Sequence, residues 1–469
     1  MKIKSRRIKG IIVLIASTIF LASLFYFGES KAFSLSIEEE LILGKKFLAN
    51  VRSHFDLVDD DFADEYINDM GHYLIKPLET KHFPFHFYII KDNNLNAFAG
   101  PGGHIFIFSG LIEVMDEIDE LAAVICHEIG HISARHISQR VEQNKKIGLA
   151  TMAGVLAGVL IGGEAAGAIT TGAVAAGIQK QLSYSRNDER QADQLGFNYT
   201  VASGFDPSGM ITTLKKLHQG QWSGADRIPP YLLTHPGGSE RMSDIEIMLA
   251  DHNRKPDTKE TKRFRELFPF FKTIIRAKYL EPHEAERLFN EELEKDPDSP
   301  MAHFGLGIVW KERSEYPRSI NHLRKALIGL PESLPILRNL GEAYQLVGQD
   351  NEAIAVLEKA LEKDNQDRSS LFLLAVSYQQ MEEYQKAARL FERLTFMEPV
   401  KDEVYYNLGV SYGRQGRLAI AHYNFGIYFK RLKKIQKARF HFQKADDLAK
   451  DDPALRGRIR EAMKDMVSK

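Results

Sequence analysis

Small and apolar residues recur at a fixed interval through the C-terminal part of the chain, from about residue 262 onward. Two small-residue columns and one aromatic column each repeat every 34 positions. A repeat of this length predicts helix pairs that stack on their neighbours as an α-solenoid. The columns are Gly307, Gly341, Ala375 and Gly409; Trp310, Tyr344, Tyr378 and Tyr412; and Ala285, Ser319, Ala353, Ala387 and Ala421.

The spacing inside each repeat is that of the tetratricopeptide motif. A large apolar residue follows the second small column by four positions, and prolines at 297, 331 and 399 close individual repeats. We therefore predict a tetratricopeptide repeat domain over residues 262–469. The concave surface of such an array binds extended peptides or a helix of another protein, so this domain is predicted to recruit partners and not to catalyse.

The chain before the repeats follows another pattern, and we assign residues 33–261 to a separate domain. Apolar residues at helical spacing, with no proline, predict a helix over 118–136. Runs dense in aromatic and β-branched residues at 85–90 and 104–108 predict two neighbouring strands of a small sheet. The expected fold class is therefore mainly α, with a domain of helices and a small β-sheet followed by the α-solenoid.

The second of these strands has two interpretations, which stay open on the sequence alone. As an exposed sheet edge, it would pair with an extended substrate through main-chain hydrogen bonds. It fits an ordinary core strand equally well. The residues of this candidate substrate strand are His104, Ile105, Phe106, Ile107 and Phe108.

The candidate metal-binding and catalytic residues lie in the predicted helix, in the sequence His127-Glu128-Ile129-Gly130-His131. Residues four apart lie one above the other on a helix, so the imidazoles of His127 and His131 converge and Glu128 leans toward the same space. This H-E-x-x-H spacing is typical of a zinc site with a glutamate base, although an amphipathic helix can match it by chance. We predict a zincin-type metallopeptidase domain that binds one Zn²⁺ per subunit.

Catalytic zinc takes three protein ligands and keeps one position open, so a third ligand is expected downstream. The best candidate is Glu189, in the segment 185–193. Asp193 lies one helical turn further on, where it could accept a hydrogen bond from a ligand histidine and fix its orientation. Without the upstream motif, this pair of acids would be interpreted as a solvated helix face.

Taken together, these motifs resemble those of the HtpX-like zinc metallopeptidases, and the resemblance covers nearly the whole chain. The matching elements are the H-E-x-x-H helix, the S-R-x-x-E-x-x-A-D segment at 185–193, the residues 96–103 (NAFAGPGG) and the pair His235-Pro236 with Arg241.

The resemblance implies roles for particular residues. His127, His131 and Glu189 would hold the zinc, and Glu128 would activate water. His235 and Arg241 would lie near the metal, and His235 is a candidate fourth ligand that caps the zinc in a resting state. Zinc lowers the pKa of water and polarises a carbonyl, while Glu128 takes the proton and returns it to the leaving amine. Arg241 and His235 are the candidate side chains for stabilising the oxyanion.

The N-terminal residues predict export. Basic residues precede an uncharged apolar run over 11–27, so the remainder of the chain is expected in the periplasm. Residues 1–32 are either a signal peptide, which the small residues at 30–32 favour, or a membrane anchor. A Gly/Ala-rich hydrophobic hairpin at 148–178 is too short to cross a bilayer; it is either a lid or membrane-touching plug, or a hairpin packed on the catalytic helices. Membrane association through either segment stays open.

Composition narrows the function classes further. A formal net charge of −1 over 469 residues argues against nucleic-acid binding. The single cysteine, Cys126, permits no intramolecular disulfide and is interpreted as a small buried residue.

The sequence therefore predicts an exported zinc metalloendopeptidase that hydrolyses misfolded or stalled envelope polypeptides, which the repeats recruit. By resemblance, its clients would be outer-membrane proteins and its partner their insertion machinery. Two alternatives stay open. One is an envelope chaperone or scaffold in which proteolysis is secondary, and the other is a zinc hydrolase acting on peptidoglycan peptides.

Overall fold

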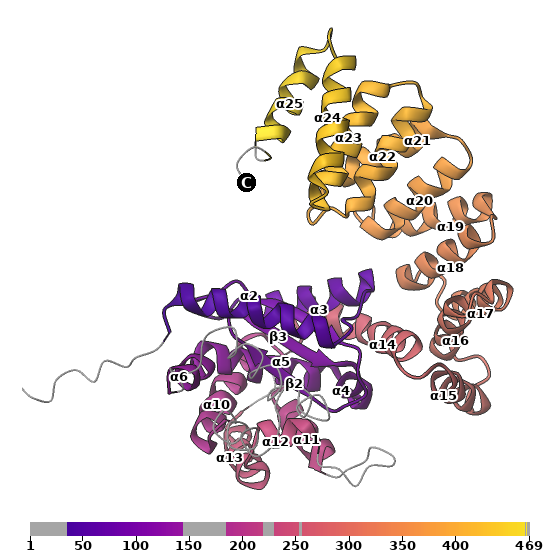
Figure 1. Ribbon diagram of the computed structural model, residues 1–469. Coiled ribbons are helices and arrows are strands. Elements are labelled where there is room, and N and C mark those ends of the chain that lie inside the picture. Colours follow the sequence, from indigo (N-terminus) through magenta and orange to yellow (C-terminus); the bar gives the residue numbers. More distant parts are fainter. Residues whose placement is uncertain (1–34, 144–183, 219–228, 253–255, 465, 467–469) are drawn as a thin grey trace, which may run out of the picture.

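The computed structural model describes residues 35–143, 184–218, 229–252, 256–464 and 466 (Figure 1). The predicted N-terminal segment 1–32 and the predicted hairpin 148–178 lie outside the described residues. The first half contains α2 (Ile37–His54), α3 (Asp61–Leu74), β1 (His86–Ile90), β2 (Ala97–Gly100), β3 (His104–Phe108), α4 (Ser109–Val114), α5 (Ile118–Ser133), α6 (His136–Gln143), α10 (Arg186–Ala202), α11 (Ser208–His218), α12 (Pro230–Thr234) and α13 (Gly238–Ala250).

A three-stranded sheet organises this half, in the order β1-β3-β2. β1 is parallel to β3 and β2 is antiparallel to it. Phe47 of α2 contacts Phe98 and Phe106 on one face. Phe87 points to the opposite face, where it meets Gly71 of α3, and α5 packs beside α3 against β2 and β3. The sheet is therefore covered by helices on both faces.

The strand at 104–108 is β3, and it is the central strand. All five of its residues are buried, with hydrogen-bonded neighbours on both sides. The expectation of an exposed edge at this strand is therefore wrong, and the core-strand interpretation holds. The physical reason is that helices cover both faces, which leaves almost no polar position along the strand. The predicted pairing with the 85–90 segment is confirmed.

Helix α14 (Lys259–Tyr279) joins the two halves of the chain. Phe264, Phe268 and Phe271 pack in the core of the first half, while Ile274 and Ala277 pack with the first repeats. The boundary predicted at 261/262 thus falls inside a helix that both halves share.

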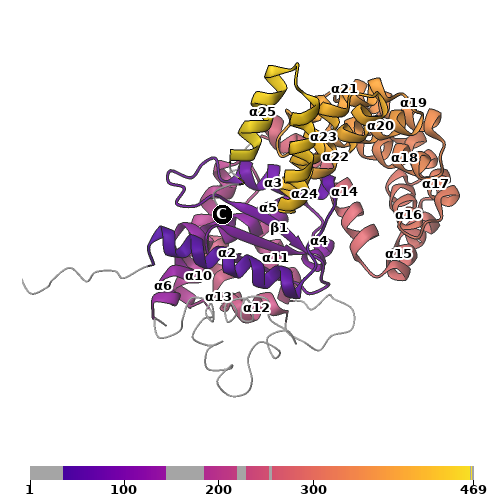
Figure 2. The same cartoon turned by 45° about the horizontal axis from the view of Figure 1, so that its top comes forward.

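The remaining helices form the predicted repeat array, which Figures 1 and 2 show as an arc. Small residues accommodate the large ones: a Cβ added at Gly307 would lie 2.6 Å from Cγ of Leu323, and one at Gly341 equally close to Leu357. The expected fold class is confirmed. The helices are α15 (Pro282–Lys295), α16 (Pro300–Glu312), α17 (Tyr316–Gly329), α18 (Leu334–Leu346), α19 (Asp350–Lys363), α20 (Arg368–Gln380), α21 (Tyr384–Leu394), α22 (Asp402–Arg414), α23 (Leu418–Arg431), α24 (Ile435–Leu448) and α25 (Pro453–Lys464).

The arc returns to the first half of the chain at α3. The Oγ atom of Ser369 lies 3.2 Å from Oδ2 of Asp61, and Arg368 pairs with Glu65 at 3.8 Å. Lys401 also pairs with Asp61. Within the described ranges, no helix is both long and apolar enough to span a membrane.

Candidate metal centre

Helix α5 carries the H-E-x-x-H motif through the interior of the first half. Its N-terminus is capped by Glu120, whose Oε2 accepts from the backbone N–H of Asp116 at 2.7 Å. Nearly every residue of this helix is buried. The Nε2 atoms of His127 and His131 lie 3.0 Å apart, as the four-residue spacing predicts. Cys126 is buried as expected, and burial raises the pKa of its thiol to about 12.

Helix α10 brings Glu189 to the two histidines. It starts at a capping box, in which Ser185 Oγ accepts from the Asp188 N–H and Asp188 accepts from the Ser185 N–H. The helix packs very closely on α5. A Cβ at Gly130 would lie 2.8 Å from the carbonyl oxygen of Ala192, and one at Gly196 would lie 2.9 Å from Cα of His127. The two glycines therefore set the approach of Glu189 to the motif.

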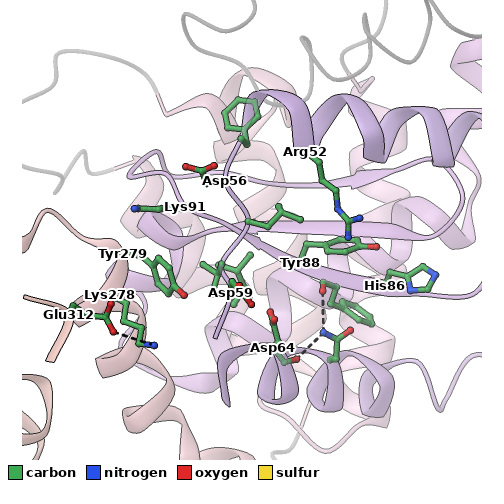
Figure 3. A pocket seen from close by; sticks show the side chains of 16 residues that line it. Arg52, Asp56, Asp59, Asp64, His86, Tyr88, Lys91, Lys278, Tyr279 and Glu312 are labelled. Carbon is green, nitrogen blue, oxygen red and sulfur yellow. Dashed lines mark hydrogen bonds and ion pairs between the residues drawn. The ribbon is translucent and has the colours of Figure 1, made fainter. Parts of the chain in front are cut away.

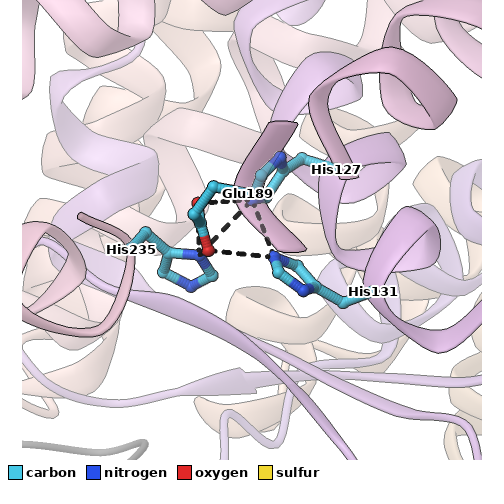
Figure 4. A group of neighbouring side chains, drawn as sticks. All are labelled: His127, His131, Glu189 and His235. Carbon is cyan, nitrogen blue, oxygen red and sulfur yellow. Dashed lines mark hydrogen bonds and ion pairs between the residues drawn. The ribbon is translucent and has the colours of Figure 1, made fainter. Parts of the chain in front are cut away.

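Four side chains converge at this point, as Figure 4 shows: His127, His131, Glu189 and His235. All four are buried, and their candidate ligand atoms lie within 4.8 Å of one another. Nδ1 of His235 is 3.1 Å from Oε1 of Glu189 and 3.3 Å from Nε2 of His127. Oε1 of Glu189 is 3.4 Å from Nε2 of His131.

These separations fit a tetrahedral metal. Ligand atoms held about 2.1 Å from one zinc ion at tetrahedral angles are about 3.4 Å apart. The closest separations between donor atoms here run from 3.0 Å for the two motif histidines to 3.6 Å between His127 and Glu189, and all lie within 4.8 Å. Three imidazole nitrogens and one carboxylate are also a donor set that zinc accepts. The residues therefore fit the metal that the motif implies, with His235 in the fourth position.

Glu128 lies beside this cluster and makes no ligand contact with it. It is fully buried, yet within the described part of the chain neither of its carboxylate oxygens has a hydrogen-bond partner. Its Oε1 is 3.7 Å from Nε2 of His235. Burial raises the pKa of Glu128. Buried polar groups rarely lack partners, so the arrangement suits a carboxylate that exchanges protons with a bound reactant.

Arg241 lies beside the candidate ligands, where it is held by two carboxylates. Its Nε and Nη2 donate to the two oxygens of Asp193 at 2.7 Å each, and its Nη1 pairs with Oε2 of Glu189 at 2.8 Å. Nη1 also lies 3.5 Å from the carbonyl oxygen of His235. These contacts hold the carboxylates of Glu189 and Asp193 in place, and the role of Arg241 in stabilising an oxyanion stays a prediction.

Three aromatic residues that the sequence analysis missed complete the surroundings. Nδ1 of His136 lies 2.9 Å from Nδ1 of His131. Tyr184 stacks on the ring of His131 with a centroid separation of 3.8 Å, and Tyr231 stacks on His235 at 4.3 Å. Each stands close to a motif in the sequence, but a single aromatic residue in that position carries no pattern of its own.

The helix with two histidines and a glutamate, a carboxylate from a second helix and a neighbouring small sheet together define a metallopeptidase. Residues 62–248 match the model of Peptidase family M48, and residues 281–335, 336–369 and 372–421 match tetratricopeptide repeat models. The chain therefore carries a peptidase domain of family M48 followed by tetratricopeptide repeats, and it is a metalloendopeptidase.

Among curated proteins, the chain is similar to two that are named beta-barrel assembly-enhancing protease. The protein from Yersinia pestis is 28% identical over 381 residues, which cover 79% of this chain and 76% of that protein. The protein from Escherichia coli K12 is 34% identical over 221 residues, which span 46% of this chain and only 45% of that protein. A crystal structure of MamA matches 33% of this chain and 84% of its own, at 22% identity and a TM-score of 0.30.

Proposed function

We propose that the chain is an exported zinc metalloendopeptidase that hydrolyses unfolded or misassembled envelope polypeptides recruited by its repeats. The observation that carries the proposal is the buried carboxylate of Glu128, 3.7 Å from His235, beside four converging ligand side chains. His127, His131 and Glu189 would hold the zinc. Zinc bound there supplies Lewis-acid polarisation of a water molecule and of the peptide carbonyl.

The remaining chemistry falls to residues of the chain. Glu128 accepts the proton of the attacking water, and its raised pKa makes it a competent donor of that proton to the leaving amine. Asp193 and Arg241 position His127 and Glu189 through the contacts described above. His235 occupies the fourth position in this arrangement, which corresponds to a resting state, and it must move away before a substrate carbonyl can enter.

Because β3 is the central strand, we propose β2 as the strand that pairs with the substrate. β2 is an edge strand of the sheet, and α5 packs against it. An extended substrate that pairs with β2 would run past Glu128 and present successive peptide bonds to it. Recognition through the main chain suits clients that are unfolded and share no sequence.

The client class rests on the N-terminal sequence and on the relatives. A basic and apolar N-terminus predicts export, and the names of the two relatives point to assembly of β-barrels. We propose outer-membrane proteins as clients and their insertion machinery as the partner of the repeats.

Glu128→Gln tests the peptidase assignment. The full-length variant should retain one zinc per chain, measured by elemental analysis, while hydrolysis of unfolded casein falls by about 10²-fold or more. Glu38→Gln, on the exposed first turn of α2, is the matched control and should keep both properties. Unchanged hydrolysis by Glu128→Gln would show that the proposed base is wrong.

A chaperone or scaffold is the second candidate, and the closeness of His235 to the other ligands favours it, because a metal capped by His235 would be silent. The same variant separates the two functions. If Glu128→Gln still prevents aggregation of an unfolded outer-membrane protein as well as the unmodified chain does, the binding function is independent of hydrolysis.

A further inference from the structure

A cavity of about 920 Å³ lies along the outer edge of β1, away from the metal centre (Figure 3). Arg52 at the end of α2 lies on one side of the strand, and Asp64 and Asn68 of α3 lie on the other. Lys278 and Glu312, from the first helices of the repeat half, close one end. None of the metal-binding residues lines this space. We call it the β1 cleft.

The strand order leaves β1 with one neighbour in the sheet, so its second edge faces this cleft. The N–H of His86 donates to the carbonyl of Gly103 on the β3 side. Because backbone groups alternate along a strand, those of Phe87 and Ile89 point outward. The carbonyl of Phe87 accepts a long hydrogen bond of 3.3 Å from the side-chain amide of Asn68.

At one end, this edge of β1 is already hydrogen-bonded to another segment of the chain. The N–H of Val58 donates to the carbonyl of Ile89 at 2.8 Å, and the N–H of Lys91 donates to the carbonyl of Asp56 at 2.9 Å. These bonds form an isolated antiparallel bridge between Leu57 and Ile90. The edge geometry is therefore compatible with a further antiparallel strand next to His86 and Phe87.

Arg52, Lys91 and Lys278 line the cleft together with acidic residues, and the acidic residues next to α3 indicate which strand it would take. Asp60 and Asp61 are paired with Lys278 and Lys401. Asp59 and Asp64 line the cleft and form no ion pair with any residue in the described ranges. Burial, with the negative charge of Asp60, Asp59 and Asp61, raises the pKa of Asp64 to about 7. A cation placed here would relieve that repulsion.

We propose that the β1 cleft binds an extended polypeptide segment as an added β-strand, with a lysine or arginine side chain against Asp59 and Asp64. Main-chain hydrogen bonds to the edge at Phe87, beyond the part that residues 56–58 already cover, would give affinity, and the two carboxylates would select the basic residue. This goes beyond the proposed function, because the cleft takes no part in hydrolysis and holds a polypeptide at the opposite edge of the sheet from β2.

Binding is measured on the full-length Glu128→Gln chain, so that the probe is not cleaved and a failure of the peptidase assignment does not affect the result. The probe is a fluorescein-labelled peptide in which valine alternates with lysine. Changing Asp59→Asn and Asp64→Asn together should raise its Kd at least tenfold, and a peptide with glutamate in place of lysine should bind at least tenfold more weakly. Asp69→Asn, on the same helix but outside the cleft, should leave the Kd unchanged. An unchanged Kd in the double variant would overturn the proposal.

A second measurement separates strand addition from attraction of charge alone. N-methylation of alternate residues along one edge of the probe removes the N–H groups that pair with β1, and it should raise the Kd at least tenfold. Methylation of the other alternate residues, which face away from β1, should have little effect. Equal affinity of both methylated probes would show that the cleft binds charge without adding a strand, and would overturn that part of the proposal.

Discussion

The Nδ1 atom of His127 lies 2.9 Å from Oδ1 of Asp193. Although burial opposes ionisation, the charge of Arg241 and the hydrogen bond with His127 lower the pKa of Asp193 to about 2. Asp193 is therefore an anion at neutral pH, and its Oδ1 lies where it favours a proton on Nδ1 of His127. This tautomer leaves the Nε2 lone pair of His127 directed at His131 and Glu189, where a metal would bind.

Asp193→Asn should consequently weaken zinc binding while leaving the ligands in place. Loss of such a supporting carboxylate typically costs about 10- to 100-fold in metal affinity. Competition with a chelator of known affinity measures the effect. Asp244→Asn is the control, because Asp244 forms an exposed pair with Arg190 at 3.5 Å. Equal zinc affinity in Asp193→Asn and the unmodified chain would contradict the role assigned to Asp193.

Gly196→Ala should disturb the metal centre without changing any ligand. The added Cβ would meet Cα of His127 at 2.9 Å, so α10 must move away from α5 and carry Glu189 with it. Overpacking of this kind costs about 1–3 kcal/mol. We expect a lower melting temperature and weaker zinc binding.

Gly457→Ala is the matched control for this change, because a Cβ at Gly457, inside α25, would meet no atom within 4 Å. It should keep zinc affinity and raise stability slightly, by up to about 1 kcal/mol. If Gly196→Ala behaved like Gly457→Ala, the close approach of α10 would not determine the position of Glu189.

These glycines also illustrate what the sequence could reveal. The H-E-x-x-H spacing and the 34-residue period are patterns of the sequence itself, so they predicted the convergence of His127 and His131 and the stacked helix pairs directly. Gly196 and His127 lie in segments that are far apart in the chain, so no periodic pattern predicts their close approach.

The same limit explains the incorrect expectation for β3 and the omission of Tyr184. A hydrophobic strand has the same sequence pattern at the edge of a sheet as in its centre. The central position of β3 is decided by its pairing with β2, which is only four residues long. Tyr184 precedes the motif of α10, yet its stacking on His131 depends on how α10 and α5 are brought together. The pairing of Arg241 with Asp193 and Glu189 was not predicted, because these partners come from another helix.

His235→Ala should open the fourth position. Nδ1 of His235 lies 3.1 Å from Glu189, so removing the imidazole should weaken zinc binding moderately and increase casein hydrolysis several-fold. His283→Ala, an exposed residue of α15, should change neither. If hydrolysis is lost while zinc is retained, His235 stabilises the reaction and does not cap the resting site, which was the other role predicted for it.

Asp64→Asn should stabilise the protein at alkaline pH and have little effect at acid pH. The folded-state pKa of Asp64 is about 7, which lies above that of an unfolded aspartate. Its contribution to stability is therefore complete below about pH 4 and is lost as the pH rises through 7. Asparagine does not ionise and escapes this loss. After allowance for solvent screening at this half-buried site, we expect the variant to gain about 1–2 kcal/mol in free energy of unfolding at pH 8 and close to none at pH 4, measured by urea unfolding.

Asp69→Asn is the control, because the carboxylate of Asp69 pairs with Arg263 at the surface. This variant should show no such difference between the two pH values. A gain that is equal at both pH values would mean that Asp64 carries no buried charge, and would remove the electrostatic argument for the β1 cleft.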